Sequence, residues 1–412
     1  MPAFELIQQA RSLNFHPSFH CPPLPALALG VLSLFGGLFA GCYGPAVMAE
    51  DAAVLPGTDE IVATETLVVE SASVSELEDL LDRLADKRVV FVGESHDRFE
   101  DHLNQLAVIQ GLHARGRDLA IGMEFFQQPF QPQLDAFVAG ELDEAALLRK
   151  TEYFERWRYD YRLYRPLLRF AREHGIPIVA LNIEREITDK VGDQGIASLD
   201  QAEASRIPAE IDRTNQRYRD HVKAVFDLHP VGGDAVFEHF LEVQLLWDEG
   251  MAERAADYLQ QHPEKSLVVL AGSGHIEYGW GIPSRFQRRL AATSATLLNG
   301  RARPFDPKRA DFILFPRAVE LPKTGLLGVM LDTESAGEGI GIHGFAEQSG
   351  AKEAGVEKGD RILRIAEHPI RSYADIRIAL MDSRPGQRLP VQVLRKPLIG
   401  SAQRLTLEVE LH

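Results

Sequence analysis

The sequence predicts an α/β fold with a mostly parallel sheet and helices on both of its faces, followed by a small β-rich domain. From residue 75 onward, short apolar segments alternate with amphipathic ones, and each apolar segment runs into polar residues. After about residue 323 the pattern changes to short alternating strands with one or two helices. Apolar strands separated by helices indicate a parallel sheet that is buried on both faces. The length of 412 residues fits two or three domains.

The strands of the main domain are predicted from four short apolar segments. They cover residues 88–92, 118–123, 176–181 and 266–271. The segments between them have the spacing of apolar residues that is typical of amphipathic helices. The predicted helices are residues 75–85, 103–113, 131–137, 143–150, 163–174 and most of 205–258, where Pro230, Gly232 and Gly233 interrupt the pattern.

The composition narrows the classes of function. With 45% hydrophobic and 25% charged residues, the chain is an ordinary globular protein rather than a disordered or fibrous one. Its formal net charge of −16 argues against nucleic acid as the main partner, because phosphate binding requires a basic surface. Both cysteines, Cys21 and Cys42, lie near the N-terminus, so the rest of the chain has neither a disulfide framework nor a cysteine metal site.

Residues 1–49 are predicted to be an export segment. The stretch 24–40 is apolar and uncharged and is followed by small residues, which is the pattern of a secretory signal. The sequence LFAGC, which ends at Cys42, resembles a bacterial lipoprotein box; this implies a lipid anchor on that cysteine and an exported protein of the cell envelope, at the outer membrane. Cleavage after Ala49 and an uncleaved anchor stay open. The acidic residues 50–74 are predicted to form a tether.

Polar residues follow the predicted strands at their carboxyl ends. These residues are Glu94, His96, Glu124, Asn182 and His275. Ligands of parallel α/β sheets bind beyond the carboxyl ends of the strands, so we expect the five to meet at one edge. The two imidazoles and two carboxylates among them are candidate ligands for a divalent metal ion, or candidate catalytic acids and bases. The alternative is that the glutamates cap helices and the histidines make loop hydrogen bonds.

A second candidate site lies in residues 151–166. Aromatic residues recur there at helical spacing, with arginines between them: Tyr153, Trp157, Tyr161, Tyr164 and Arg165. Aromatic faces beside guanidinium groups suit a flat, acid-bearing ligand such as a porphyrin, and a tyrosine can ligate haem iron. The alternative is an amphipathic helix that packs on the sheet. Tyr218 and His221 share a face of a predicted helix and are further candidates.

Several ordered motifs between Val89 and about Arg289 resemble the ChaN-type haem-binding lipoproteins, which belong to a wider group with Tiki-like and erythromycin-esterase-like enzymes. The motifs are Gly93–Asp97 (GESHD), Met123–Phe126 with Gln128, Trp157, Tyr164–Leu168 (YRPLL), Ile178–Asn182 (IVALN), Ala271–His275 (AGSGH) and Gly279–Pro283 (GWGIP). They cover nearly half of the chain.

This resemblance implies two functions for a main domain that spans residues 75–320. The first is haem binding in haem or iron uptake, with a pair of cofacial haems shared between two chains and therefore a homodimer. The expected haem contacts are Tyr153, Trp157, Tyr161, Tyr164, Arg165, Asn182, Tyr218 and His221. The second is hydrolysis, with a metal ion in some relatives, at Glu94, His96, Glu124 and His275. The resemblance does not choose between them.

Residues 324–412 resemble a PDZ domain of the bacterial protease-associated type. The resembling motifs are GLLGV from Gly325, GAKEAGV from Gly350 and KGDRIL from Lys358. The resemblance implies that Leu326, Leu327, Gly328 and Val329 bind the carboxylate of a peptide or protein C-terminus, while the peptide adds a strand to the sheet. The alternative is a domain used for self-association or for packing on the main domain.

Overall fold

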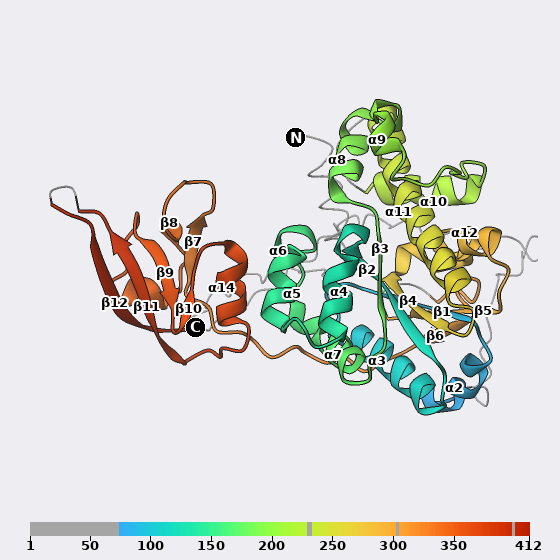
Figure 1. Ribbon diagram of the computed structural model, residues 1–412, viewed down its shortest axis with the longest axis horizontal. Coiled ribbons are helices and arrows are strands. Elements are labelled where there is room, and N and C mark those ends of the chain that lie inside the picture. Colours follow the sequence, from blue (N-terminus) through green and yellow to red (C-terminus); the bar gives the residue numbers. More distant parts are fainter. Residues whose placement is uncertain (1–73, 229–232, 302–304, 398–399) are drawn as a thin grey trace, which may run out of the picture. The chain divides into compact units, whose positions relative to one another are not determined.

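A computed structural model describes residues 74–228, 233–301, 305–397 and 400–412 (Figure 1). The predicted export segment with Cys42, and all of the predicted tether except its last residue, lie outside these ranges. Residues Glu76–His412 fall into one compact unit. Within the described ranges, no helix combines the length and the apolar character that crossing a membrane requires.

The main domain is built on a six-stranded parallel sheet, which confirms the predicted α/β class (Figure 1). Its strand order is β3-β2-β4-β1-β5-β6. The strands are β1 (Val89–Glu94), β2 (Leu119–Gln127), β3 (Ile178–Asn182), β4 (Ser266–Gly272), β5 (Ser294–Asn299) and β6 (Phe312–Leu314). The first four are buried along their whole length, as their continuous apolar runs predict.

The sheet extends two strands beyond the sequence prediction. In β5 buried and half-buried residues alternate at first, and β6 has only three residues. Neither strand shows the continuous apolar run that identified the other four. Both strands therefore depend on pairing with their neighbours rather than on a strong local pattern.

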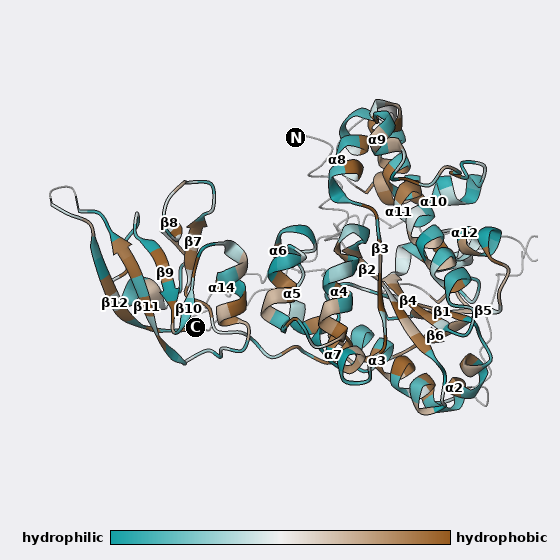
Figure 2. Cartoon of the chain, in the orientation of Figure 1, coloured by the Kyte–Doolittle hydropathy of each residue, from teal (hydrophilic) through white to brown (hydrophobic). Residues whose placement is uncertain are grey.

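Helices cover both faces of this sheet. The alternation along β1 shows it: Val90 and Val92 pack into the cluster under α2 to α7, whereas Val89 and Phe91 pack into the cluster under α8 and α10 to α12. In Figure 2 the strands of this sheet are largely hydrophobic. The helices are α2 (Leu77–Ala85), α3 (Phe99–Ala114), α4 (Gln131–Val138), α5 (Glu144–Lys150), α6 (Tyr153–Arg156), α7 (Tyr161–Glu173), α8 (Arg185–Gln194), α9 (Gln201–Ala204), α10 (Gln216–Phe226), α11 (Asp234–Gln261) and α12 (Ile282–Arg289).

The C-terminal domain is an antiparallel sheet with two helices, as expected of a PDZ domain. Its strand order is β12-β11-β9-β8-β7, and β10 pairs with β9. Its core contains Ile362, Val391, Val393 and Val409. The elements are β7 (Val329–Asp332), β8 (Ile340–Phe345), α13 (Gly350–Glu353), β9 (Arg361–Ile365), β10 (His368–Pro369), α14 (Tyr373–Leu380), β11 (Arg388–Arg395) and β12 (Gln403–Glu410).

Candidate functional site

The strand order brings three chemistry-bearing strand ends together. β4 lies between β2 and β1, and Glu94 at the end of β1 pairs in register with Gly272 at the end of β4. β2 pairs with β4 as far as Met123, so Glu124 is the first residue beyond that ladder. His275 follows β4 in a short 3₁₀ turn. The carboxyl ends of adjacent parallel strands therefore form the expected edge.

One half of this site is the pair Glu94 and His96. Nδ1 of His96 lies 2.5 Å from Oε1 of Glu94, and both side chains are buried. A Cβ atom at Gly272 would lie 2.9 Å from Cε1 of His96. Glycine at this position therefore lets the imidazole approach the end of β4 closely. The N–H of Gly272 donates to Oε2 of Glu124 at 2.7 Å, which links this pair to the next carboxylate.

The other half is a chain of hydrogen bonds and ion pairs that ends on His275. Its Nε2 lies 3.5 Å from Oε1 of Glu124, and its Nδ1 lies 2.7 Å from Oδ1 of Asp248. The hydroxyl of Tyr218 donates to Oδ2 of Asp248 at 2.6 Å. Tyr218 comes from α10 and Asp248 from α11, so helices on one face of the sheet support the imidazole.

Asp248 is a site residue that the sequence reasoning missed. It is 1% exposed in the middle of α11, directly after the apolar residues Leu245, Leu246 and Trp247. A carboxylate within a buried helical stretch requires a partner, since burial of an unpaired charge is strongly unfavourable. That signal was present in the sequence, but the partner, His275, lies 27 residues away.

The charges of the site are coupled. Burial disfavours the charged form of His275, but the carboxylates of Glu124 and Asp248 outweigh burial and raise the pKa of His275 to about 10. Burial also opposes ionisation of Glu124, but the imidazoles and a backbone N–H lower its pKa to about 2. The pKa of His96 lies above its ordinary value because Glu94 outweighs the effect of burial. At neutral pH, His275 is therefore an imidazolium between two carboxylates.

Two buried residues of α3 lie behind Glu94. Oδ2 of Asp101 accepts the N–H of Ser95 at 2.9 Å, and burial raises the pKa of this carboxyl to about 7. Nε2 of His102 lies 3.8 Å from Oε2 of Glu94, and burial lowers the pKa of this imidazole. Asp101 and His102 were not singled out from the sequence. They place two further titratable groups behind the Glu94–His96 pair.

A set of possible metal ligands comprises Glu94, His96 and Glu124. One ligand atom from each lies within 4.8 Å of the others. His275, which the sequence grouped with them, is not part of this set in the described residues.

The fifth residue of the expected edge, Asn182, lies at the end of the outer strand β3. Its Oδ1 accepts the N–H of Ile183, and it pairs in register with Gln127. Among the described residues, no hydrogen bond or ion pair joins it to the other four. The edge therefore gathers four of the five predicted residues, as two directly interacting pairs whose members Glu94, His96 and Glu124 have ligand atoms within 4.8 Å of one another.

The aromatic stripe predicted to contact haem is mostly core. Tyr153, Tyr161 and Tyr164 are at most 1% exposed, and burial raises the pKa of each phenol well above its ordinary value. The stripe is not one helix, because α6 and α7 are separated at residues 157–160, where Arg158 has a φ of 72°. The packing matches the alternative of an aromatic helix face that packs against the sheet.

The break between α6 and α7 brings aromatic rings to the Glu/His site. The centroid of the Trp157 ring lies 4.8 Å from that of His96, and the half-buried ring of Tyr159 lies 4.9 Å from it. The hydroxyl of Tyr164 donates to the backbone oxygen of His96 at 3.2 Å. Arg158, between the two aromatic residues, is exposed. These residues form one wall of the site.

The remaining predicted haem contacts have other partners. Arg165 bonds the carboxylates of Glu144 and Asp382. Tyr218 belongs to the chain that ends on His275, whereas Nε2 of His221 pairs with Glu277 at 2.9 Å. Tyr218 and His221 thus share a helix but contact different residues.

The predicted carboxylate-binding loop borders a groove of about 690 Å³ that is lined mainly by residues of the PDZ domain. All four loop residues, Leu326 to Val329, line it together with Ile376 and Leu380 of α14 and Leu331 of β7. The groove therefore lies between a strand edge and a helix, where a PDZ peptide would add to the sheet.

Two family models match the chain. Residues 80–286 match a family described as "Haem-binding uptake, Tiki superfamily, ChaN", and residues 325–411 match the PDZ domain family. Among curated proteins, the chain is 22% identical over 233 residues to the protein RETICULATA-RELATED 5, chloroplastic, of Arabidopsis thaliana. That alignment covers 52% of this chain and 31% of the relative, so the chain spans about a third of the relative's length.

Solved structures also match parts of the chain. A ChaN of Campylobacter jejuni with cofacial haem is 18% identical and covers 59% of this chain and 93% of its own, with a TM-score of 0.46. A mutant of the erythromycin esterase EreC in its open conformation is 13% identical and covers 69% and 84%, with a TM-score of 0.33. The HtrA-type protease AlgW with a decapeptide is 27% identical and covers 22% and 30%, with a TM-score of 0.19.

Proposed function

The chain belongs to the ChaN family of haem-binding uptake proteins in the Tiki superfamily, and we propose on this basis that its α/β domain binds haem for haem or iron uptake. The observation that carries the proposal is the family match over residues 80–286, which contains the whole Glu/His site. Haem is here a cargo rather than a resident cofactor. We further propose that the protein is exported to the cell envelope with a lipid anchor on Cys42.

The predicted haem contacts differ in how well their positions suit haem binding. A buried phenol whose pKa is raised is a poor iron ligand, so Tyr153, Tyr161 and Tyr164 do not fit that role. The segment beside His96 fits a porphyrin better, because the half-buried ring of Tyr159 offers an aromatic surface and the exposed Arg158 carries a guanidinium that suits a propionate. We therefore propose that residues 157–159 hold the ring.

Titration of the full chain with haem tests this proposal. We expect a Soret band that shifts on binding, and about threefold to tenfold weaker binding for Arg158→Gln, which loses one charged contact. Arg172→Gln is the matched control, because Arg172 stacks on Phe137 away from the site. An unchanged haem spectrum with the wild-type protein would remove the proposal.

Hydrolysis is a second candidate function, favoured by the chain from Tyr218 through Asp248 to His275. Such a chain fixes the orientation and protonation of the imidazole, which could then donate a proton to a leaving group. Glu94 and His96 supply a second acid–base pair. Glu94, His96 and Glu124 also offer the nitrogen and oxygen donors that suit a divalent ion. Such an ion, when bound, supplies an activated water.

Metal analysis and an ester-hydrolysis assay with p-nitrophenyl acetate test the second candidate. We expect stoichiometric divalent metal and turnover in the wild-type protein, and loss of both in Glu124→Gln. His275→Gln should lose turnover but keep the metal, because only the other three residues form the ligand set. Glu184→Gln, whose carboxylate pairs with Arg206, is the matched control. A metal-free wild-type protein without turnover would count against this function.

We also propose that the PDZ domain captures a peptide C-terminus at its groove. The support is the position of Leu326 to Val329 beside β7 and opposite α14. Isothermal calorimetry with a peptide ending in Leu-Val and with its amidated form measures this directly. Equal affinity for the two peptides would contradict carboxylate capture.

A further inference from the structure

We propose that the PDZ groove is completed by the α6–α7 segment of the α/β domain, takes an acidic C-terminal peptide, and acts through that segment on the wall of the Glu/His site. The inference rests on the proposed peptide binding and deepens it. It names the class of peptide that binds, and it connects the PDZ groove with the Glu/His site, which lie in regions matched by two different family models.

Helix α14 belongs to two hydrophobic clusters at once. Its residues Ile376 and Leu380 pack in the PDZ core. Ala374 and Ile378, on another side of the helix, pack in the main cluster of the α/β domain. The same helix forms one wall of the peptide groove. A change in the position of α14 would therefore alter the packing of both domains.

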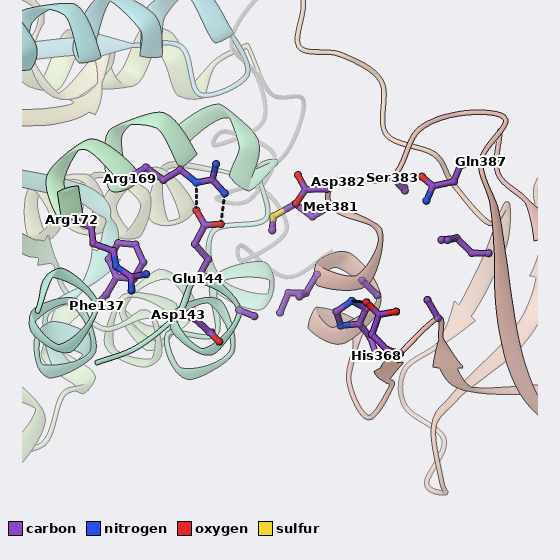
Figure 3. A pocket seen from close by; sticks show the side chains of 16 residues that line it. Phe137, Asp143, Glu144, Arg169, Arg172, His368, Met381, Asp382, Ser383 and Gln387 are labelled. Carbon is purple, nitrogen blue, oxygen red and sulfur yellow. Dashed lines mark hydrogen bonds and ion pairs between the residues drawn. The ribbon is translucent and has the colours of Figure 1, made fainter. Parts of the chain in front are cut away.

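Ion pairs fasten α14 and its end to α5 and α7. Nε of Arg149 lies 2.7 Å from Oδ1 of Asp375, near the start of the helix. Arg165 bonds Asp382 just beyond its end and also bonds Glu144. A pocket of about 670 Å³ is lined by Glu144 and Asp382 of this bridge, and Figure 3 shows Arg169 bonding Glu144 there. The link between the domains is therefore made of specific charged contacts as well as apolar ones.

The α/β domain also lines the peptide groove. Phe154, Asp160, Tyr161 and Arg162 line it together with the PDZ residues. The guanidinium of Arg377, on α14, lies 5.1 Å from the centre of the Phe154 ring. A peptide in the groove would therefore contact α6 and the start of α7 as well as the PDZ domain.

The segment that lines the groove continues directly into the wall of the Glu/His site. Phe154 lies at the groove, and Trp157 and Tyr159 contact the ring of His96. Glu152, which precedes this stretch, and Arg158, which lies within it, have φ angles of 51° and 72°, in the left-handed region that non-glycine residues rarely adopt. Strained positions of this kind are often found where a segment must switch between arrangements.

The charges of the groove indicate the class of peptide. Arg162, Lys323 and Arg377 line it, and Asp160 is the carboxylate among the lining residues. Asp160 is already bonded by Arg162, with Nη2 to Oδ2 at 2.7 Å. The net charge of these lining side chains is therefore positive, which suits a peptide with acidic side chains. The apolar part of the lining, with Leu327 buried below it, suits an aliphatic C-terminal residue.

The test uses the full chain labelled with 5-fluorotryptophan, which gives one ¹⁹F resonance for each of its 3 tryptophans. The Trp157 resonance is assigned with Trp157→Phe. The probe is an N-acetylated peptide of three glutamates followed by Leu-Val with a free carboxylate. We expect the Trp157 resonance to shift in a saturable way, and about tenfold weaker binding when the glutamates are replaced by lysines.

Two variants test separately the binding of the peptide and its effect on Trp157. Arg377→Gln should weaken binding of the acidic peptide severalfold, while Arg404→Gln, on β12 and paired with Glu338, should not. Phe154→Leu should reduce the shift at Trp157 even at a peptide concentration at which the anisotropy of a labelled peptide shows that the groove is saturated. Circular dichroism confirms that each variant is folded.

Three outcomes would overturn the inference. They are no binding of the acidic peptide to the wild-type chain, equal binding of the lysine peptide, or saturation of the groove without any movement of the Trp157 resonance. None of these readouts involves haem or hydrolysis. Failure here is therefore distinguishable from failure of either proposed activity of the α/β domain.

Discussion

Replacing Asp248 with asparagine tests whether buried carboxylates hold His275 in its charged form. The side chain of Asp248 is 1% exposed, and Oδ1 lies 2.7 Å from Nδ1 of His275. Asparagine keeps the shape of the side chain but removes the charge. Glu124 remains 3.5 Å from the other ring nitrogen and should keep part of the effect.

The magnitude follows from the pKa of His275, which rises from 6.5 to about 10 on folding. At about 1.4 kcal/mol for each pH unit, the net stabilisation of the charged imidazole, after the opposing effect of burial, is roughly 5 kcal/mol. If the two carboxylates contribute equally and also offset burial, Asp248→Asn should cost at least about 2.5 kcal/mol of unfolding free energy near pH 6. Because the folded pKa is the higher one, this contribution is fully present below pH 6.5 and is lost as the pH rises through about 10.

Two measurements check the reasoning. Nitrogen-15 NMR of the imidazoles should show the pKa of His275 falling in Asp248→Asn, and urea unfolding should show a stability loss at pH 6 that shrinks above pH 10. Glu264→Gln is the matched control, since Glu264 is exposed and lies 3.8 Å from the half-buried His262, and it should leave stability unchanged. An unaltered His275 pKa, or a stability loss that is the same at both pH values, would refute the argument.

Three further predictions concern the site and its support. Burial raises the pKa of Asp101 from 3.8 to about 7, so this carboxyl lowers the stability of the fold more and more as the pH rises between those values. In urea unfolding, Asp101→Asn should remove this pH dependence and raise the unfolding free energy by up to about 4 kcal/mol at pH 7. A Cβ at Gly93 would lie 2.3 Å from Cδ2 of Leu298, so Gly93→Ala should cost about 1–3 kcal/mol in the same assay. For the hydrolytic candidate, dialysis against EDTA should release the bound divalent ion and lower the thermal midpoint, whereas Glu124→Gln should show no midpoint shift with EDTA.

The local pattern of the sequence was sufficient for the strands β1 to β4 and for the residues that end them. All four of these strands are buried on both faces. Their sequences are therefore continuous apolar runs, which can be recognised without knowing which strands pair with them. The polar residue after each run was then identifiable as a candidate for the edge of the sheet.

Only the tertiary structure decided which of those candidates meet. The strand order places β4 between β1 and β2, which joins Glu94, Glu124 and His275 and leaves Asn182 on the outer strand. It also placed Asp248 against His275 and buried the tyrosines of α7, because partners far apart in the chain are selected by packing and by the need to pair buried charges. Residue types and their periodicity specify strands and helices locally, whereas the neighbours of a side chain depend on contacts that no local pattern contains.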